Sequence, residues 1–404
     1  MKIISVVGAR PNFMKVAPIL AAIEKHNGSQ SSRGGERIES VLVHTGQHYD
    51  AKMSDSFFED LRLPSPDIQL GVGSGTHAAQ TAEVLRKFEG VLLEHRPDAV
   101  IVVGDVNSTV ACALATAKIS FDAQGTRPLL AHVEAGLRSF DRTMPEEVNR
   151  VVTDHVSDLL FVTEPSGERN LLSEGISSDS IAFVGNTMID SLLAWRGKAD
   201  HSPILERLGL RGTSGIVKYG LVTLHRPSNV DNPEIFLQIL NGLEEFALEH
   251  PILFPVHPRT KQRMLDFGLE GKLRARVHRS DDSSVAQNGF VTLDPLGYLD
   301  FVCLMKNAAV VVTDSGGIQE ETTCLGVPCV TVRENTERPV TVDQGTNVIV
   351  GTKADRIRAA IRERSERGVN PSAPEKWDGH AAERIVGRLL EAHSRREFAN
   401  QVAV

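Results

Sequence analysis

Features that the sequence lacks exclude several classes of protein. Only four cysteines occur in 404 residues, with no CxxC pair and no metal-ligand spacing, so neither a disulfide scaffold nor a zinc domain is expected. No run of about 18 apolar residues is present, and the apolar run before Gly8 is too short for a secretion signal. We therefore expect a cytoplasmic protein whose cysteines are reduced and buried.

Three ligand-binding signatures are also missing. The chain has no GxxxxGK[ST] P-loop, no GxGxxG after its first strand, and no DxD or histidine cluster with metal-ligand spacing. Its net charge of −8 and pI near 6.0 argue against a nucleic-acid partner or an anionic membrane. A small anionic ligand held by a few local cations is still compatible with this composition.

Length and periodicity predict two α/β domains. A chain of 404 residues exceeds one ordinary core, and short continuous apolar runs such as KIISVV and DAVIVVGD alternate with helical segments such as HAAQTAEVLRKFEGVLLEH. This pattern is typical of parallel sheets with both faces covered. We expect doubly wound domains over 1–186 and 187–379, a linker near 186–215, and a helix over 380–400 that packs back on the first domain.

Polar residues follow many of the predicted strands. Ligands of open α/β sheets bind outside the carboxyl ends of the strands. One polar residue there is ordinarily a helix cap, but seven such strand ends favour a ligand between the two domains. The seven segments are Gly8-Ala9-Arg10, Thr45-Gly46-Gln47-His48, Gly104-Asp105, His132-Val133-Glu134, His225-Arg226, His257-Pro258-Arg259 and Asp314-Ser315-Gly316-Gly317.

The last of these segments combines a phosphate-binding pattern with negative charge. Ser315 can cap the following helix, and Gly316 and Gly317 let a phosphate approach its N–H groups. Glu320 and Glu321 follow at once; in an ordinary capped helix they are favoured by the helix dipole. We favour a nucleoside diphosphate, because a carboxylate's two oxygens suit the two hydroxyls of a ribose, and the negative charges would then face the sugar and not the phosphate.

The order of these motifs resembles one family from end to end. The chain is similar to the non-hydrolysing UDP-N-acetylglucosamine 2-epimerases, which are built on the GT-B fold, with two doubly wound Rossmann-like domains and the active site in the cleft between them. The resemblance implies a UDP-N-acetylhexosamine substrate, a homodimer, and no cofactor or metal. The matching blocks are GARPNFMKVAPI, TGQH, VVGDVNST, HVEAGLRS, MPEEVNRVVTDHVSDLLFVTE, VGNTMIDS, VTLHR, PVHPRT, LGYLDFVCLM, TDSGGIQEE and ENTERP.

The resemblance also implies which residues bind the substrate, and it places UDP on the C-terminal domain. The implied residues are Ser315, Gly316 and Gly317 for the diphosphate, Glu321 for the ribose, Phe301 for the uracil pocket, Arg10, Lys15 and Arg338 chiefly for the anionic part of the substrate, and His257 in the substrate pocket.

The implied reaction inverts C2 of the sugar, a carbon with no adjacent carbonyl to acidify its proton. A nicotinamide route would need the dinucleotide fingerprint that the chain lacks. In the family, UDP leaves C1 and the C2 proton leaves, giving a glycal; UDP then adds back and a proton reaches the opposite face. Such chemistry needs acid–base groups on both faces and stabilisation of the diphosphate. The implied residues are Asp105 and Glu134 for proton transfer, Glu146 supporting or sharing that role, and His225 assisting at the diphosphate.

Each of these four residues has a simpler alternative role. Asp105 can cap a helix that begins near 107–109, and His225 can be a hydrogen-bonded histidine at a strand end. Two carboxylates have the i, i+4 spacing of helix ion pairs worth only tenths of a kcal/mol, namely Glu134 with Arg138 and Glu146 with Arg150.

Two segments depart from the family pattern. Family members activated by a second UDP-GlcNAc carry a QHR motif and a nearby arginine, whereas this chain has Gln47-His48-Tyr49-Asp50 and no arginine in 70–81. Allosteric activation of that kind is therefore not expected. The block RSFDRTMPEE (138–147) is shorter than in the best-known enzymes and resembles that of archaeal relatives and of enzymes acting on UDP-2,3-diacetamido-2,3-dideoxy-glucuronate.

Four alternative functions are weighed against the leading prediction, which is a UDP-GlcNAc 2-epimerase supplying surface polysaccharide precursors. The first is the same reaction on the diacetamido uronate, with Arg142 as a candidate contact near C6. A hydrolysing epimerase is disfavoured because HVEAGLRS and VVGDVNST resemble the non-hydrolysing enzymes. A GT-B glycosyltransferase is disfavoured because it would need an acceptor cleft. A nucleotide-sugar sensor is disfavoured because it would have no use for three carboxylates and a histidine at strand ends.

Overall fold

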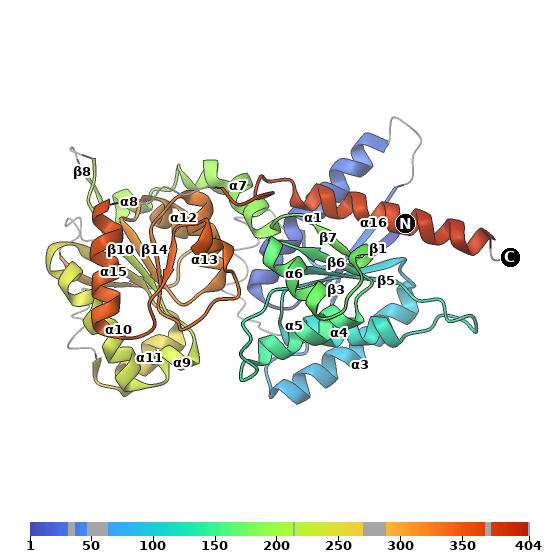
Figure 1. Cartoon of the computed structure of the whole chain (residues 1–404), viewed down its shortest axis with the longest axis horizontal. Helices are drawn as coiled ribbons and strands as arrows, with labels where there is room; N and C mark the ends of the chain where they lie inside the picture. Colours follow the sequence, from blue (N-terminus) through green and yellow to red (C-terminus); the bar gives the residue numbers. More distant parts are fainter. Residues whose placement is uncertain (31–36, 47–63, 213–214, 270–287, 368–372, 403–404) are drawn as a thin grey trace. The chain divides into compact units, whose positions relative to one another are not determined.

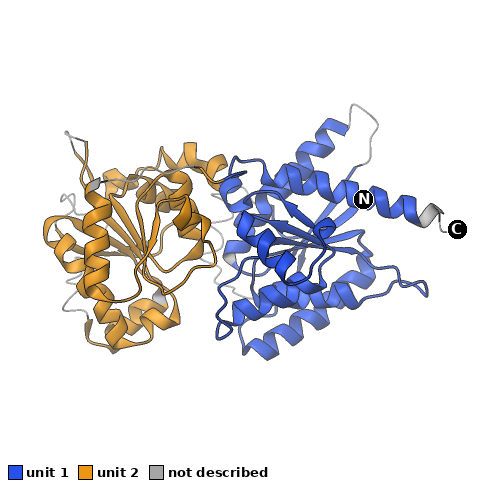
Figure 2. Ribbon diagram, viewed as in Figure 1, with its two compact units in different colours: residues 1–191, 375–404 blue, residues 192–374 orange. Residues whose placement is uncertain are grey.

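The computed structural model contains two compact units, which Figure 2 colours separately. It describes residues 1–30, 37–46, 64–212, 215–269, 288–367 and 373–402. Unit 1 consists of Met1–Ser191 and Glu375–Val404, and unit 2 consists of Leu192–Pro374. Each unit is built on a large parallel sheet flanked by helices (Figure 1).

Unit 1 has a seven-stranded parallel sheet in the order β3-β2-β1-β4-β5-β6-β7. Its central strand β4 is buried at every position, as expected for a parallel strand covered on both faces. The strands are β1 (Lys2–Val7), β2 (Glu39–His44), β3 (Ile68–Gln69), β4 (Ala99–Val103), β5 (Leu129–Ala135), β6 (Leu159–Val162) and β7 (Ile181–Phe183). The helices are α1 (Arg10–Gln30), α3 (His77–His95), α4 (Asn107–Lys118), α5 (Pro145–Val156), α6 (Pro165–Ser173), η1 (Ser178–Ser180), α7 (Thr187–Ala199), which continues into unit 2, and α16 (Ala381–Val402).

Unit 2 has a six-stranded parallel sheet in the order β12-β11-β10-β13-β14-β15 and a separate two-stranded antiparallel pair. The strands are β8 (Arg211–Gly212), β9 (Gly215–Ile216), β10 (Gly220–Thr223), β11 (Pro251–Pro255), β12 (Gly289–Leu293), β13 (Val310–Thr313), β14 (Cys329–Thr331) and β15 (Asn347–Ile349). The helices are α8 (Ile204–Arg207), α9 (Pro227–Val230), α10 (Pro233–Glu249), α11 (Pro258–Asp266), α12 (Tyr298–Asn307), α13 (Gly316–Leu325), α14 (Val340–Asp343) and α15 (Ala354–Arg367).

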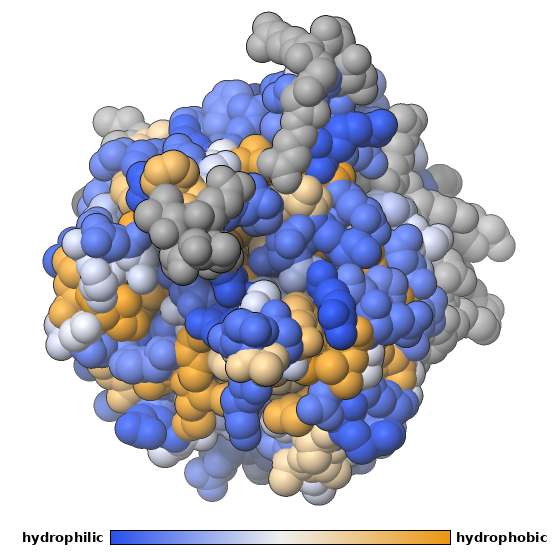
Figure 3. All heavy atoms as spheres, turned by 90° about the vertical axis from the view of Figure 1, so that its right-hand side faces the viewer, coloured by the Kyte–Doolittle hydropathy of each residue, from blue (hydrophilic) through white to orange (hydrophobic). Residues whose placement is uncertain are grey.

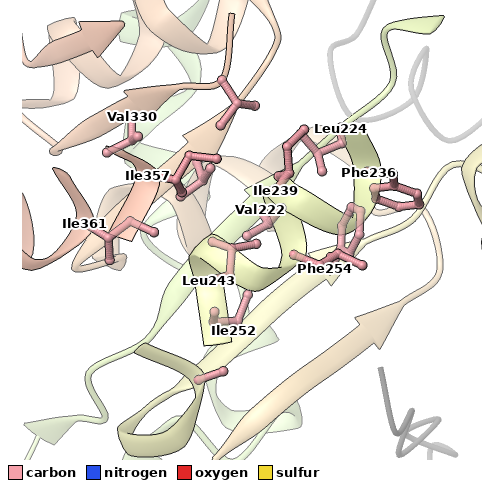
Figure 4. Packing of buried hydrophobic residues seen from close by; sticks show 14 of the residues in the cluster. Val222, Leu224, Phe236, Ile239, Leu243, Ile252, Phe254, Val330, Ile357 and Ile361 are labelled. Carbon is pink, nitrogen blue, oxygen red and sulfur yellow. The ribbon is translucent and has the colours of Figure 1, made fainter. Parts of the chain in front are cut away.

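The core of unit 2 forms where α10 packs with α15 and the sheet (Figure 4). Phe236, Ile239 and Leu243 lie on one face of α10 because their spacing follows the helical period. They are at most 1% exposed, as is Ile357 of α15, and each such side chain stabilises the unit by roughly 1.5–3 kcal/mol. Asn232 starts α10 by accepting hydrogen bonds from the helix's first N–H groups. Unit 2 therefore has a rigid core beneath its strand ends.

Both sheets reverse their strand order at a topological switch point. In unit 1 it lies between β1 and β4, and in unit 2 between β10 and β13. Gly104 and Asp105 follow β4 directly, whereas Asp314 and Ser315 follow β13. Ligands of open α/β sheets bind outside the carboxyl ends of strands at such points. The topology therefore indicates a ligand site at these two groups of strand ends.

The last helix of the chain belongs to unit 1, where α16 packs against α1. Asp190 accepts hydrogen bonds from the N–H groups of Ala381 and Ala382, at 3.2 and 2.8 Å. Trp377 donates its indole N–H to the carbonyl of Thr163 at 3.0 Å. These contacts attach the C-terminal segment to the sheet of unit 1.

The surface carries isolated apolar side chains. The face in Figure 3 mixes hydrophilic residues with smaller groups of hydrophobic ones. Phe140, Leu248 and Phe398 are the most exposed large hydrophobic residues in the described ranges, and they lie in the segment before α5, on α10 and on α16. Scattered apolar side chains of this kind are ordinary on folded proteins. Among the described helices, none is long and apolar enough to cross a membrane.

Candidate active site

A buried ion pair lies at the switch point of unit 1. Lys15 of α1 and Glu134 of β5 approach with Nζ and Oε2 2.5 Å apart, and their side chains are 7% and 3% exposed. Burying either charge alone would cost several kcal/mol in lost hydration, so the two charges depend on each other. Asn12 accepts hydrogen bonds from the N–H groups of Gly8 and Ala9, at 3.2 and 2.9 Å, and thereby ties the end of β1 to α1. A carboxylate and a cation are thus fixed at the strand ends.

The backbone at Glu134 is strained. Its φ is +72°, in the left-handed region that residues other than glycine rarely adopt. The pairing of β5 with β6 shifts register between Val133 and Ala135, which is a β-bulge that re-aims the side chain. Such a conformation costs about 1–3 kcal/mol and is concentrated at functional sites. Gly104 has φ of +67°, and a Cβ there would lie 3.0 Å from Nζ of Lys15, so glycine suits the position on both counts.

Asp105, which follows Gly104, is held in place by hydrogen bonds from residues of α5. Arg150 donates from Nε and Nη2 to Oδ2 of Asp105, at 3.0 and 2.7 Å, and from Nη1 to Glu147 at 2.5 Å. Asn149 donates to the backbone carbonyl of Asp105 at 2.9 Å. The N-cap of α4 is Val106, so the alternative in which Asp105 caps that helix is wrong. Both predicted proton-transfer carboxylates of unit 1 therefore face a buried cation.

The two adjacent glutamates of α5 have opposite environments. Glu146 is exposed, whereas Glu147 is 3% exposed and accepts hydrogen bonds from the N–H groups of Ser139 and Phe140, at 2.9 and 2.8 Å. Arg150 pairs with Glu147 at i, i+3, so the i, i+4 alternative for Glu146 is wrong. Sequence reasoning missed Glu147, although the helical spacing of the buried polar positions on α5 was a signal that could have found it.

The sequence also predicted the wrong ion-pair partner for Arg138. Its Nη1 lies 2.7 Å from Oδ2 of Asp154, and its Nε lies 2.8 Å from Oε1 of Glu174. The i, i+4 ion pair between Glu134 and Arg138 is therefore wrong. An i, i+4 pair needs a helix, whereas Glu134 lies on strand β5 and Arg138 in the irregular segment after it.

Asp314 organises the switch point of unit 2. It is fully buried and accepts hydrogen bonds from the backbone N–H of His225 and of Arg226, from Nδ1 of His225 at 2.9 Å, and from Nδ2 of Asn229 at 3.1 Å. Burial favours the protonated form, but these donors, led by His225, hold the pKa of Asp314 below its usual range. The His225 side chain is itself 53% exposed. The buried Asp314 thus orients the ring, which is accessible to solvent.

The start of α13 combines a helix N-terminus with a guanidinium. Ser315 stands at the N-cap but makes no capping hydrogen bond through its side chain to any described residue of the first turn, so the ordinary serine cap is wrong. Its N–H donates to Oγ1 of Thr313 at 3.0 Å. Gly316 and Gly317 begin the helix, and a Cβ at Gly316 would lie 3.0 Å from Nη1 of Arg338. Helix N–H groups and an arginine fork are both donors suited to a phosphate.

The two glutamates that follow are neutralised in different ways. Glu320 is fully buried and pairs with Arg338, with Oε1 and Nε 2.6 Å apart. Oε1 of Glu321 accepts a hydrogen bond from the hydroxyl of Tyr298 at 2.8 Å. Burial, only partly offset by that hydrogen bond, raises the pKa of Glu321 to about 7. A phosphate at α13 would therefore meet one ion-paired glutamate and one that binds a proton near neutral pH.

Glu321 makes stability depend on pH. Its pKa rises from 4.5 to about 7 on folding, so its stabilising contribution is complete below pH 4.5 and is lost as pH rises through about 7. Between pH 5 and pH 8, we expect the free energy of unfolding of the wild type to fall by roughly 2–3 kcal/mol more than that of Glu321→Gln. Urea titration at each pH measures this free energy. The exposed Glu94→Gln serves as control. Parallel pH profiles for wild type and Glu321→Gln would refute this assignment.

Comparison with known proteins settles the family. The family model for UDP-N-acetylglucosamine 2-epimerase matches residues 31–390, which is most of the chain. The chain belongs to this epimerase family. The family prediction from the sequence is thereby confirmed, and the activity class is that of an epimerase.

Individual relatives of this epimerase match over almost their whole length. The UDP-N-acetylglucosamine 2-epimerase of Methanocaldococcus jannaschii is 41% identical, covering 96% of this chain and 99% of its own. The UDP-2,3-diacetamido-2,3-dideoxy-D-glucuronate 2-epimerase of Pseudomonas aeruginosa is 38% identical, covering 97% and 100%. The crystal structure of the M. jannaschii enzyme in complex with UDP-GlcNAc and UDP has a TM-score of 0.82, covering 97% of this chain and 100% of its own. The predicted GT-B fold of two Rossmann-like domains is confirmed.

The epimerase's remaining predicted site residues follow β1, β11 and β12 along the chain. Arg10 is the first residue of α1, directly after β1. Phe301 is half-buried on α12. His257 is exposed and starts α11, where its Nδ1 accepts the N–H of Arg259 at 3.3 Å. The variant motif at 47–50 lies outside the described residues.

The predicted residues therefore form two groups, one in each unit. In unit 1, Lys15 forms an ion pair with Glu134 and lies next to Gly104, the residue that precedes Asp105. Unit 2 places Ser315, the two glycines, Arg338 and Glu321 around the start of α13. Across the described ranges, no three His, Cys, Asp or Glu side chains are grouped so as to hold a metal ion.

Proposed function

We propose that this epimerase interconverts UDP-GlcNAc and UDP-ManNAc without hydrolysis. The C1–O bond to UDP breaks and a base takes the C2 proton, which gives a glycal and UDP. UDP then adds back to C1 while an acid delivers a proton to the opposite face of C2. No oxidant or reductant is needed, since the elimination and the addition balance. The M. jannaschii relative, whose structure is described with UDP-GlcNAc and UDP, supports this substrate.

The buried pair of Lys15 and Glu134 at the bulge of β5 is the observation that carries the proposal. A strained, desolvated carboxylate is suited to proton transfer, a role worth about 10²–10⁴ in rate. We assign proton transfer at C2 to Glu134 and Asp105, one for each face of the sugar. Glu146 supports or shares that role from the first turn of α5. The N-terminal Rossmann-like domain, residues 1–186, thus carries the acid–base chemistry.

The C-terminal domain, residues 187–379, is assigned to UDP. The diphosphate must be stabilised as it leaves C1, and the first turn of α13 with Arg338 supplies N–H groups and a cation. His225, oriented by Asp314, assists at the same diphosphate. The other proposed contacts are Ser315, Gly316 and Gly317 at the phosphates, Glu321 at the ribose, Phe301 at uracil, Arg10 and Lys15 chiefly at the anionic part of the substrate, and His257 in the substrate pocket.

A second candidate substrate is UDP-2,3-diacetamido-2,3-dideoxy-glucuronate. The relative from P. aeruginosa that is named for this activity is 38% identical, only slightly below the 41% of the M. jannaschii enzyme. Arg142 is exposed in the segment before α5 and could meet a carboxylate at C6 of such a sugar. This uronate is the alternative that the substrate assay must exclude.

Substrate identity is tested by assaying both nucleotide sugars in parallel. We expect kcat/KM to be at least about 100-fold higher for UDP-GlcNAc, because a carboxylate at C6 is costly to bury unless a cation pairs with it. Arg142→Ala should leave UDP-GlcNAc turnover within about threefold, a change below 1 kcal/mol. Preference for the uronate, lost in Arg142→Ala, would assign the second candidate. Release of free N-acetylmannosamine would instead show a hydrolysing enzyme.

The family resemblance supports a homodimer in the cytoplasm that supplies surface polysaccharide precursors. Light scattering after gel filtration should give twice the mass of one chain, and cell fractionation should recover the activity with the cytoplasm. A monomer mass at assay concentration, with full activity, would contradict the homodimer.

A further inference from the structure

His132 is a fully buried histidine on β5, two residues before Glu134. Its Nε2 lies 2.9 Å from the backbone carbonyl oxygen of Gly104. Its Nδ1 lies 2.6 Å from Oδ1 of Asp154 on α5. Since Gly104 immediately precedes Asp105, the imidazole connects α5 to the turn that carries a proposed proton-transfer residue.

Both ring nitrogens of His132 face hydrogen-bond acceptors. A carbonyl oxygen can only accept, so Nε2 carries a hydrogen. Asp154 already accepts at Oδ2 from Nη1 of Arg138 at 2.7 Å and from the N–H of Gly136 at 3.0 Å, the surroundings of a carboxylate. Oδ1 of this carboxylate, 2.6 Å from Nδ1, is an acceptor as well, so each ring nitrogen of His132 is placed to donate a hydrogen bond.

The charges of the buried network balance when His132 is protonated. Arg138, with a side chain 1% exposed, pairs with Asp154, whose side chain is fully buried, and with Glu174, whose side chain is 25% exposed. One arginine against two carboxylates leaves one negative charge, which the imidazolium cancels. His155 lies 3.8 Å from Glu174, but its side chain is 44% exposed, so water screens it. An uncancelled buried charge would cost several kcal/mol, so the balance favours the imidazolium.

We propose that His132 is a positioning residue, an imidazolium that fixes the turn at Gly104 and Asp105 for proton transfer; the inference rests on the proposed function. β5 holds Gly104 on both sides, because the Gly104 N–H donates to the Val133 carbonyl at 3.0 Å and its own carbonyl accepts from His132. Releasing the carbonyl would let the turn relax. A misplacement of 1 Å at a catalytic group can cost about 10²-fold in rate.

Two substitutions separate the two hydrogen bonds of His132. The amide nitrogen of His132→Gln can replace Nε2 and donate to Gly104, whereas that of His132→Asn replaces Nδ1 and donates only to Asp154. We expect His132→Asn to lower kcat for epimerisation by about 30–300-fold with KM within about threefold. His132→Gln should retain kcat within about fivefold of wild type. If His132 were needed only for folding, the two variants would lose activity in proportion to their loss of thermal stability. Thermal stability is therefore measured alongside activity.

The protonation state is measured on the wild-type protein itself. In a spectrum of ¹⁵N-histidine-labelled protein, the His132 signals, assigned by their loss in His132→Gln, should show a hydrogen on both ring nitrogens at neutral pH. A bare Nδ1, or equal kcat for the two variants at equal stability, would overturn the proposal. Wild-type protein inactive on both nucleotide sugars would refute the proposed function, and the spectrum would still decide the charge of His132.

Discussion

Glu134→Gln is expected to lower kcat for epimerisation by about 10³-fold, within the range of a lost acid–base group. The amide keeps the size of the side chain and can still accept a hydrogen bond from Lys15. Because it leaves the buried Lys15 without its ion-pair partner, we also expect a loss of stability of about 3–5 kcal/mol, so kcat is measured where the variant is fully folded. The amide cannot take up a proton from C2. Because most of the proposed UDP contacts belong to unit 2, and only Arg10 and Lys15 come from unit 1, the Kd for UDP should change far less than kcat, by less than about tenfold, or 1.4 kcal/mol.

The measurement for Glu134→Gln follows both turnover and the exchange of the C2 proton with solvent. Both should fall together, since the same carboxylate serves both. Glu94→Gln, the same change at an exposed position of α3, should leave kcat and exchange at wild-type values. A Glu134→Gln enzyme that exchanges C2 at the wild-type rate would remove Glu134 from proton transfer.

Arg338→Met should destabilise the protein by about 3–5 kcal/mol and weaken UDP binding at least about tenfold. The stability loss follows because Glu320 is fully buried and the substitution removes its ion-pair partner. The affinity loss follows because the guanidinium stands against Gly316 at the start of α13. Urea titration gives the first quantity and calorimetric titration with UDP the second.

A double substitution separates the two roles of Arg338. Glu320→Gln combined with Arg338→Met removes both buried charges, so it should recover at least half of the lost stability. It should not recover affinity for UDP, because the cation remains absent. Recovery of both quantities would show that Arg338 supports the nucleotide site only by balancing Glu320, and recovery of neither would show that the ion pair is not what stabilises unit 2.

The strands that carry the site were predictable because they are continuous apolar runs. KIISVV coincides with β1, DAVIVVGD contains β4, and the segment HAAQTAEVLRKFEGVLLEH is the helix α3. The short strands β3, β7 and β15 were not predicted. Each has only two or three residues, too few for either an apolar run or an alternation to be recognised.

Site positions could be predicted at the strand ends, but the partners of the side chains could not. Lys15 and Glu134 are 119 residues apart in sequence, and their pairing depends on the neighbouring order of β1, β4 and β5. The positive φ of Glu134 has no sequence signal, because the bulge is set by how β5 pairs with β6. The sequence likewise places Glu321 near a phosphate turn, but the hydroxyl of Tyr298 that shares its proton comes from α12.

Proton NMR of the wild-type protein with UDP-GlcNAc in D2O tests the central claim most directly. Without added nicotinamide, we expect UDP-ManNAc that carries deuterium at C2, with UDP still attached to C1. Product that retains the original C2 proton would contradict proton transfer by Glu134 and Asp105, and with it the assignment of the unit 1 switch point as the acid–base site.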